Sequence, residues 1–329
     1  MRVLLLMLLL VGDAGIPEPG PQAQPRPQYV IVSFDGAGDA EHLDHWTAVG
    51  DRVGARFTFF LSGVYLLDGD RANLYQPPRH RAGVSDIGFA IAPPGTDVRR
   101  NIADLVRSLN AASVDGHEIA SHFNGHFCGR GPGAVGGWGP ADWSREIDAF
   151  DDLVGQVAEH NDLPGMRTAF GRIAGARTPC FEGIAAFERQ AIAAHGYRYD
   201  ASEPGGGAPY RADGIWEIPI PLMEVAGAGY RTLATDYNLY LNQSRAEDVS
   251  PDEASAFRAQ AYESYRALFW SRYDGAREPV IIAHHFEDWN DGAYSLALEG
   301  LLAEVCHLRD VRCATYRDLV DALDAGSRP

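Results

Sequence analysis

The stretch YVIVSFDGAGDAEH, residues 29–42, contains a mostly apolar run that ends in an acid. The run from Val30 to Phe34 is typical of a parallel strand that is covered on both faces. Asp35 therefore ends a buried strand, where an acid serves as a metal ligand, as a general base or as the cap of the next helix. Gly36 follows it, and the next carboxylate is that of Asp39.

Segments typical of strands and helices alternate along the rest of the chain. Strands are predicted near residues 55–63, 117–121, 197–200, 215–219, 279–284 and 311–315. Helices are predicted near residues 39–54, 97–111, 141–160, 182–195, 252–273, 291–305 and 316–324, and long loops at 64–96, 123–140 and 224–250. This order predicts an α/β protein with a parallel sheet or barrel, whose ligands bind at the carboxyl ends of the strands.

Length and charge limit the class of partner. A chain of 329 residues is long enough for one large α/β domain, which we expect at residues 28–325. The net charge of −17 argues against a nucleic-acid partner, because such proteins need clustered basic side chains.

The N-terminus has the outline of an export signal. MRVLLLMLLLVGDAG combines one basic residue, an apolar run and small residues, which predicts a signal peptide at 1–14. The run is too short to span a bilayer, and a wrongly assigned start or a buried strand are the alternatives. Residues 15–27 are Pro-rich and predict a linker. We expect a secreted, periplasmic or cell-envelope protein. Its four cysteines then favour two disulfides over free buried thiols.

The stretch GHEIASHFNGH, residues 116–126, contains a histidine pair with metal-ligand spacing. His122 and His126 are four residues apart, which lets two imidazoles on one helical face reach the same divalent ion. Two surface histidines without a ligand are the alternative. The pair follows an apolar strand and opens a Gly-rich loop, which favours a site.

Three further segments carry groups for chemistry. In GARTPCF, Arg177 is suited to pair with a carboxylate and keep it ionised, and the turn after it presents a backbone N–H to a reacting carbonyl. PVIIAHHFEDW ends a strand in His284 and His285, which suits acid–base work at neutral pH, although one of the two is expected to be structural. Asp200 in YRYDAS is suited to support such a histidine, or to form a turn.

Together these segments resemble the polysaccharide deacetylases of the NodB-homology type, carbohydrate esterase family 4, over roughly residues 28–323. SFDGA resembles the family's Thr-Phe-Asp-Asp-Gly motif, and GHEIASHFNGH resembles its His-x-x-x-His motif. RTPCF, YDAS and VIIAHH resemble the three motifs that follow. The resemblance implies a distorted (β/α)7-type barrel, a divalent metal that is usually zinc, and hydrolysis of acetyl groups on a glycan.

The resemblance also implies roles for the first part of the site. Asp35 is expected to take a proton from metal-bound water, and His122 and His126 are expected to bind the metal. Arg177 is expected to orient Asp35.

The resemblance assigns the remaining roles to later segments. The backbone N–H of Cys180 is expected to stabilise the oxyanion. His284 is expected to protonate the leaving amine with support from Asp200. We choose His284 over His285 because it follows the apolar run as the family histidine does, and the register is open by one residue.

Two positions depart from the family pattern. Cys180 stands where the family has Tyr, a change that would serve a bridge between Cys128 and Cys180. Gly36 stands where the family has its metal-binding Asp, which leaves two protein ligands where catalytic zinc usually has three. Asp39 is the hypothetical replacement, because the glycines before it allow the loop to fold back.

These observations predict a monomeric, secreted, metal-dependent hydrolase that removes N-acetyl groups from a polysaccharide containing N-acetylglucosamine, of the chitin or peptidoglycan type. One alternative is a catalytically inactive glycan-binding protein that lost its metal with the second Asp. Another is an esterase that acts on O-acetylated glycan, which uses the same groups on a different leaving group.

Overall fold

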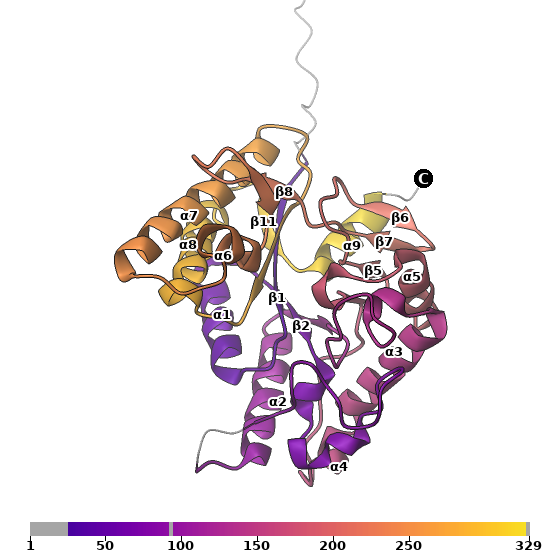
Figure 1. Cartoon of the computed structure of the whole chain (residues 1–329). Helices are drawn as coiled ribbons and strands as arrows, with labels where there is room; N and C mark the ends of the chain where they lie inside the picture. Colours follow the sequence, from indigo (N-terminus) through magenta and orange to yellow (C-terminus); the bar gives the residue numbers. More distant parts are fainter. Residues whose placement is uncertain (1–25, 92–94, 327–329) are drawn as a thin grey trace, which may run out of the picture.

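The computed structural model describes residues 26–91 and 95–326 (Figure 1). The predicted signal peptide and most of the predicted linker lie outside these residues. The strands are β1 Gln28–Asp35, β2 Thr58–Leu61, β3 Glu118–Ser121, β4 Gly175–Ala176, β5 Tyr199–Asp200, β6 Tyr210–Ala212, β7 Ile215–Glu217, β8 Leu222–Glu224, β9 Arg231–Leu233, β10 Val280–His285 and β11 Val311–Ala314.

The helices lie around these strands (Figure 1). The α-helices are α1 Ala40–Val53, α2 Val98–Val114, α3 Pro140–Gly155, α4 Val157–His160, α5 Ala185–Ala194, α6 Asp236–Ser244, α7 Pro251–Tyr273, α8 Trp289–Val305 and α9 Tyr316–Gly326. Four short 3-10 helices are η1 Gly63–Leu66, η2 Gly69–Leu74, η3 Val135–Gly137 and η4 Pro179–Phe181. None of the described helices is both long and apolar enough to cross a membrane.

The main sheet is parallel except at one edge. Its strand order is β10-β1-β2-β3-β4-β5-β7-β6, in which β6 runs antiparallel to β7, while β11 also pairs with the first half of β1. The sheet curls into a half-barrel that stays open between β10 and β6. The predicted α/β class with a parallel sheet is confirmed.

The centre of the sheet is buried because β1 and β2 are apolar on both sides. Phe34 and Phe59 are fully buried, and Phe34 packs against Trp46 of α1 with ring centroids 4.4 Å apart. The side chains of a strand alternate between the two faces, so Asp35 lies on the face opposite Phe34. The helices thus cover one face, and Asp35 is directed to the concave face at the strand ends.

Two disulfides form, as the even cysteine count predicts. One joins Cys128 to Cys180 across 52 residues, and the other joins Cys306 to Cys313. The first disulfide connects the loop after β3 with the loop after β4, both of which lie at the carboxyl ends of neighbouring strands.

The segment 224–250 is more ordered than the predicted loop. It forms β9 and then α6, whose first turn is capped by the side chain of Thr235, which accepts from the N–H of Asn238. A Thr before Asp is a helix start signal, so the residues TDYN contained the information that would have revealed α6.

Candidate active site

Asp35 and Arg177 form a buried ion pair at the end of β1. Arg177 Nη1 lies 2.6 Å from Asp35 Oδ1 and 2.8 Å from the hydroxyl of Ser33. The same guanidinium donates to the carbonyl of Ala201 and to the hydroxyl of Tyr316. Because these partners fix all three of its nitrogens, Arg177 holds Asp35 in one position.

The ion pair also sets the charge of Asp35. Burial acts to raise the pKa of this carboxyl, but the positive charge of Arg177, with His122 and His285 after it, outweighs burial and lowers the pKa below its usual value. Asp35 is therefore ionised at neutral pH and able to accept a proton.

His122 and His126 lie together beside Asp35, as the sequence predicts. Their ring centroids are 5.2 Å apart. His122 Nδ1 lies 2.9 Å from the carbonyl oxygen of Arg177, so Nδ1–H donates and the lone pair is on Nε2. Burial lowers the pKa of His122 to about 3 and lowers the pKa of His126 as well. Both imidazoles are neutral at pH 7, which is the form that binds a metal.

The pleat of β10 decides between the two adjacent histidines. Asp35 pairs in register with His285, whereas Phe34 pairs with His284. His284 is fully buried on the helix side, where its Nε2 lies 2.9 Å from the hydroxyl of Tyr265. His285 lies on the face of Asp35, and its side chain is 34% exposed. The structure therefore places His285, and not the predicted His284, on the face of Asp35, which makes His285 the candidate for the acid position.

The carboxylate that hydrogen-bonds to His285 belongs to Asp236, the first residue of α6. Asp236 accepts from His285 Nδ1–H at 2.8 Å and from the backbone N–H of His285 at 2.7 Å. Burial acts to lower the pKa of His285, but the charge and hydrogen bond of Asp236 raise it to about 9. His285 is thus protonated at neutral pH. Asp236 was not among the predicted site residues, because the segment 224–250 was predicted to be a loop.

Asp200, which the sequence assigned to this supporting role, lies elsewhere. Its carboxylate accepts from the backbone N–H and the hydroxyl of Ser202. That hydroxyl also lies 3.1 Å from Glu188 and accepts from the N–H of Thr178. Asp200 therefore belongs to a buried acidic group behind the loop that carries Cys180. The structure therefore does not place Asp200 in the predicted position beside His284 or His285.

The structure does not bring Asp39 to the histidine pair. Its side chain is 54% exposed and caps α1, accepting from His42 N–H at 2.8 Å and from His42 Nδ1 at 2.9 Å. The αL backbone of Gly36, with φ +70°, turns the chain away before it reaches the cap. The hypothesis that Asp39 replaces the missing ligand is not supported by this placement.

The donor set suits a divalent metal but lacks a carboxylate ligand. Two neutral imidazoles with accessible lone pairs fit such an ion. Within the described ranges, three potential ligand atoms come within 4.8 Å of one another only at His126, Cys128 and Cys180, and the two sulfurs there are bonded to each other. The charge of one further acid, the exposed Asp86, also acts on His126.

The disulfide holds the two loops of the site together. Cys180 has a positive φ of 56° within η4, three residues after Arg177. Its partner Cys128 lies two residues after His126, and Cys128 Sγ is 3.4 Å from His126 Nδ1. The predicted oxyanion N–H at Cys180 and the predicted metal ligand His126 are thus covalently connected.

No protein-family model and no curated protein sequence matches the chain. A Mycobacterium smegmatis protein assigned as a polysaccharide deacetylase is similar in structure, with TM-score 0.57 and 18% identity, and the match covers 93% of this chain and 96% of that one. A family 4 carbohydrate esterase from Streptomyces lividans in complex with acetate matches with TM-score 0.40 and 15% identity over 87% of this chain and 91% of that one.

A pseudoenzyme of the same family from Bacillus anthracis, BA3943, matches with TM-score 0.46 and 8% identity over 90% of this chain and 66% of that one. These last two likenesses are too distant to carry an argument. The similarity to the Mycobacterium smegmatis protein covers nearly the whole backbone of both chains. The chain therefore has the fold of that structure, an α/β half-barrel of the polysaccharide deacetylase (NodB-like) kind.

Proposed function

We propose that the protein hydrolyses N-acetyl groups on a polysaccharide that contains N-acetylglucosamine. The observation that carries this proposal is the register pair of Asp35 and His285 on neighbouring strands. One group is ionised and the other is protonated at neutral pH, and both face the same side of the sheet. Amide hydrolysis needs such a base and such an acid, because water must lose a proton and the amine must gain one.

In this mechanism Asp35 is the base. Its carboxylate accepts a proton from the attacking water, while Arg177 fixes the position of the carboxylate and keeps it ionised before the step. His122 and His126 would hold a divalent cation beside it. When bound, such a cation supplies Lewis-acid chemistry, which makes water more acidic and polarises the acetyl carbonyl.

His285 is the acid. Its Nδ1–H is engaged by Asp236, so the Nε2–H is the proton that is available to the leaving nitrogen. The backbone N–H of Cys180 is proposed to stabilise the oxyanion, and the disulfide to Cys128 fixes that loop relative to His126.

A glycan suits the surroundings of His285. Tyr237 is 43% exposed, and its ring centroid lies 6.3 Å from that of His285 and 5.6 Å from that of Trp289. Exposed aromatic rings beside a site offer flat apolar faces on which sugar rings stack. The two disulfides agree with an exported protein that acts on an extracellular polymer.

A glycan-binding protein without activity is the second candidate. Gly36 favours it, because the strand end offers no carboxylate beside Asp35 to complete the metal site. An O-acetyl esterase would use the same base and metal. It depends less on the acid, because an alkoxide leaves more readily than an amine anion.

The test combines metal analysis of the purified protein with acetate release from chitin oligomers, peptidoglycan and an O-acetylated xylan. Acetate release from the N-acetylated glycans that requires a divalent metal supports the proposal. Release from xylan alone supports the esterase. Binding of the glycans without metal and without acetate from any of them supports the binding protein.

A further inference from the structure

One imidazole of the candidate site lies against the disulfide that connects the two loops. His126 Nδ1 is 3.4 Å from Cys128 Sγ, and one ligand atom each of His126, Cys128 and Cys180 lies within 4.8 Å of the others. The disulfide-bonded sulfurs cannot serve as thiolate ligands. Reduction would convert the same cluster into one imidazole and two thiols.

The spacing of these atoms suits tetrahedral zinc. With Zn–S of about 2.3 Å and Zn–N of about 2.0–2.1 Å, a tetrahedral ion places sulfur and nitrogen about 3.5 Å apart. The observed separation between Nδ1 and Sγ of Cys128 is 3.4 Å. The Cα atoms of Cys128 and Cys180 are 6.0 Å apart, so side-chain rotation is enough to separate the sulfurs by the roughly 3.8 Å that two zinc-bound thiolates require.

We propose that the reduced protein binds a thiophilic divalent cation through His126 Nδ1, Cys128 Sγ and Cys180 Sγ. In the first step a dithiol transfers two electrons and two protons to the disulfide and becomes a cyclic disulfide itself. In the second step the cation replaces the two thiol protons, which are released to solvent. Cys180 is exposed, so the reductant reaches the bond.

The new site competes with the candidate catalytic metal site for His126. A neutral imidazole has a single lone pair, on either Nδ1 or Nε2. When Nδ1 binds the cation between the cysteines, Nε2 carries the proton and cannot bind a cation shared with His122. Reduction therefore removes one of the two histidine ligands of the catalytic metal. This competition rests on the proposed function, whereas the thiolate site does not.

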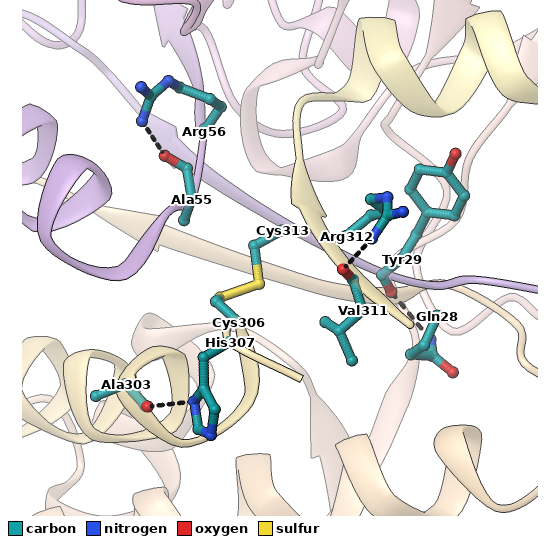
Figure 2. The surroundings of a disulfide bond; sticks show 10 residues. All are labelled: Gln28, Tyr29, Ala55, Arg56, Ala303, Cys306, His307, Val311, Arg312 and Cys313. Atoms are coloured by element: carbon teal, nitrogen blue, oxygen red, sulfur yellow. Dashed lines mark hydrogen bonds between the residues drawn. A yellow bond between two sulfur atoms is a disulfide. The ribbon is translucent and has the colours of Figure 1, made fainter. Parts of the chain in front are cut away.

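The second disulfide provides a matched comparison within the same chain. Cys306 and Cys313 also have a histidine nearby in sequence, His307. Its Nδ1 lies 3.2 Å from the carbonyl oxygen of Ala303, one turn earlier, and Figure 2 shows the ring directed toward that carbonyl and away from the sulfurs. Reduction of this pair yields two thiols without a converging imidazole.

The experiment is a Co²⁺ titration of the full chain after anaerobic reduction with dithiothreitol and desalting. The signal is the thiolate-to-cobalt charge-transfer absorption in the near ultraviolet. We expect a band that saturates at about one Co²⁺ per chain, that is absent before reduction and that is lost when Zn²⁺ is added. The C128S/C180S variant, which retains the other cysteine pair, should lack the band.

Two further variants separate this site from the proposed function. His126→Ala should weaken the Co²⁺ affinity of the reduced protein at least about tenfold, because one of three ligands is lost. His122→Ala should retain the charge-transfer band, since it belongs only to the candidate catalytic site. Circular dichroism confirms that each variant is folded. The proposal is overturned by the absence of a band in reduced wild type, by an equal band in C128S/C180S, or by unchanged affinity in His126→Ala. A lack of deacetylase activity does not contradict the proposed thiolate site, because that site does not depend on the proposed function.

Discussion

At the residue scale, the alternation of side chains along β10 determines which histidine can take part in chemistry. His285 and Asp35 occupy one face, while His284 is enclosed by Phe34, Trp46 and Tyr265 on the other. Burial lowers the pKa of His284 to about 4, whereas Asp236 raises that of His285 to about 9. Two adjacent histidines thus differ in charge at pH 7, where His284 is neutral and His285 is protonated.

Replacing His284 and His285 separately with glutamine tests which of the two acts as the acid. His285→Gln should lower kcat for acetate release by about 100-fold or more, because no acid remains for the leaving amine. His284→Gln should retain most of kcat and lower the free energy of unfolding by about 1–3 kcal/mol through loss of buried hydrogen bonding and packing. Initial rates and urea unfolding of both variants measure the two effects. Loss of activity only in the His284 variant would reverse the assignment.

The pH dependence follows from the same pair. Activity requires Asp35 without its proton and His285 with its proton. The rate should therefore fall with acid only near the lowered pKa of Asp35, and with base as pH passes about 9, the pKa of His285. Asp236→Asn removes the charge that raises the pKa of His285, so the alkaline limb of the kcat/KM profile should move to lower pH. An alkaline limb that stays in place in this variant would contradict the role of Asp236.

A substitution at Gly36, the residue after Asp35, tests whether a carboxylate ligand for the metal is missing. Gly36→Asp places a carboxylate beside Asp35, and the space is open, since the nearest atoms of Tyr65 lie 3.9 Å from the new Cβ. The αL backbone there is tolerated by Asp better than by most residues. We expect divalent metal affinity by calorimetry to increase at least about tenfold, ~1.4 kcal/mol. Gly36→Asn, with similar size and no charge, is the control and should not gain affinity.

At the scale of elements, the position of a helix determines whether an acidic residue at its start lies near the site. Asp39 is the N-cap residue of α1, and its Oδ1 accepts from the backbone N–H and from Nδ1 of His42, whereas Asp236 is the first residue of α6 and accepts from His285. Both acids lie at the start of a helix, Asp39 as the N-cap residue and Asp236 as the first helical residue. What differs is the strand beside each helix, because α6 packs against β10 and brings its first turn to the site.

The cap of α1 gives a prediction at this scale. Asp39→Ala should lower the free energy of unfolding by about 1 kcal/mol, since the helix loses its N-cap acceptor. The zinc stoichiometry and acetate release should not change, because the carboxylate does not contact His122 or His126. Urea unfolding and metal analysis of the variant provide the measurement. Loss of zinc from a folded Asp39→Ala protein would restore Asp39 as a ligand.

At the scale of the whole molecule, the parallel sheet was predictable because buried strands such as β1 read as continuous apolar runs. The sequence also predicted that Asp35, the histidine pair and Arg177 lie together, because they are at the ends of strands that finish at one edge of the sheet. It did not identify Asp236, because α6 is short and its position depends on tertiary packing. The position after the apolar run favoured His284 over His285 and left the register open by one residue, because a one-residue shift exchanges the faces of a strand and only the pairing with β1 fixes it.

Contacts across the whole molecule keep the rest of the site in place although Gly36 provides no carboxylate. Arg177 contacts β1, the loop after β5 and α9 through Asp35, Ala201 and Tyr316. The base is therefore held by the sheet and not by a metal. The positions of Asp35 and Arg177 are thus built into the fold and do not depend on a bound metal.

Acetate release from a chitin oligomer, with zinc supplied, tests whether Asp35 takes part in deacetylation. Wild type and Asp35→Asn, which has nearly the same shape, are compared at neutral pH. We expect acetate from wild type and a rate about 100-fold or more lower in Asp35→Asn, with both proteins folded. Equal rates in the two proteins, or no acetate from wild type on chitin oligomers and on peptidoglycan, would contradict it.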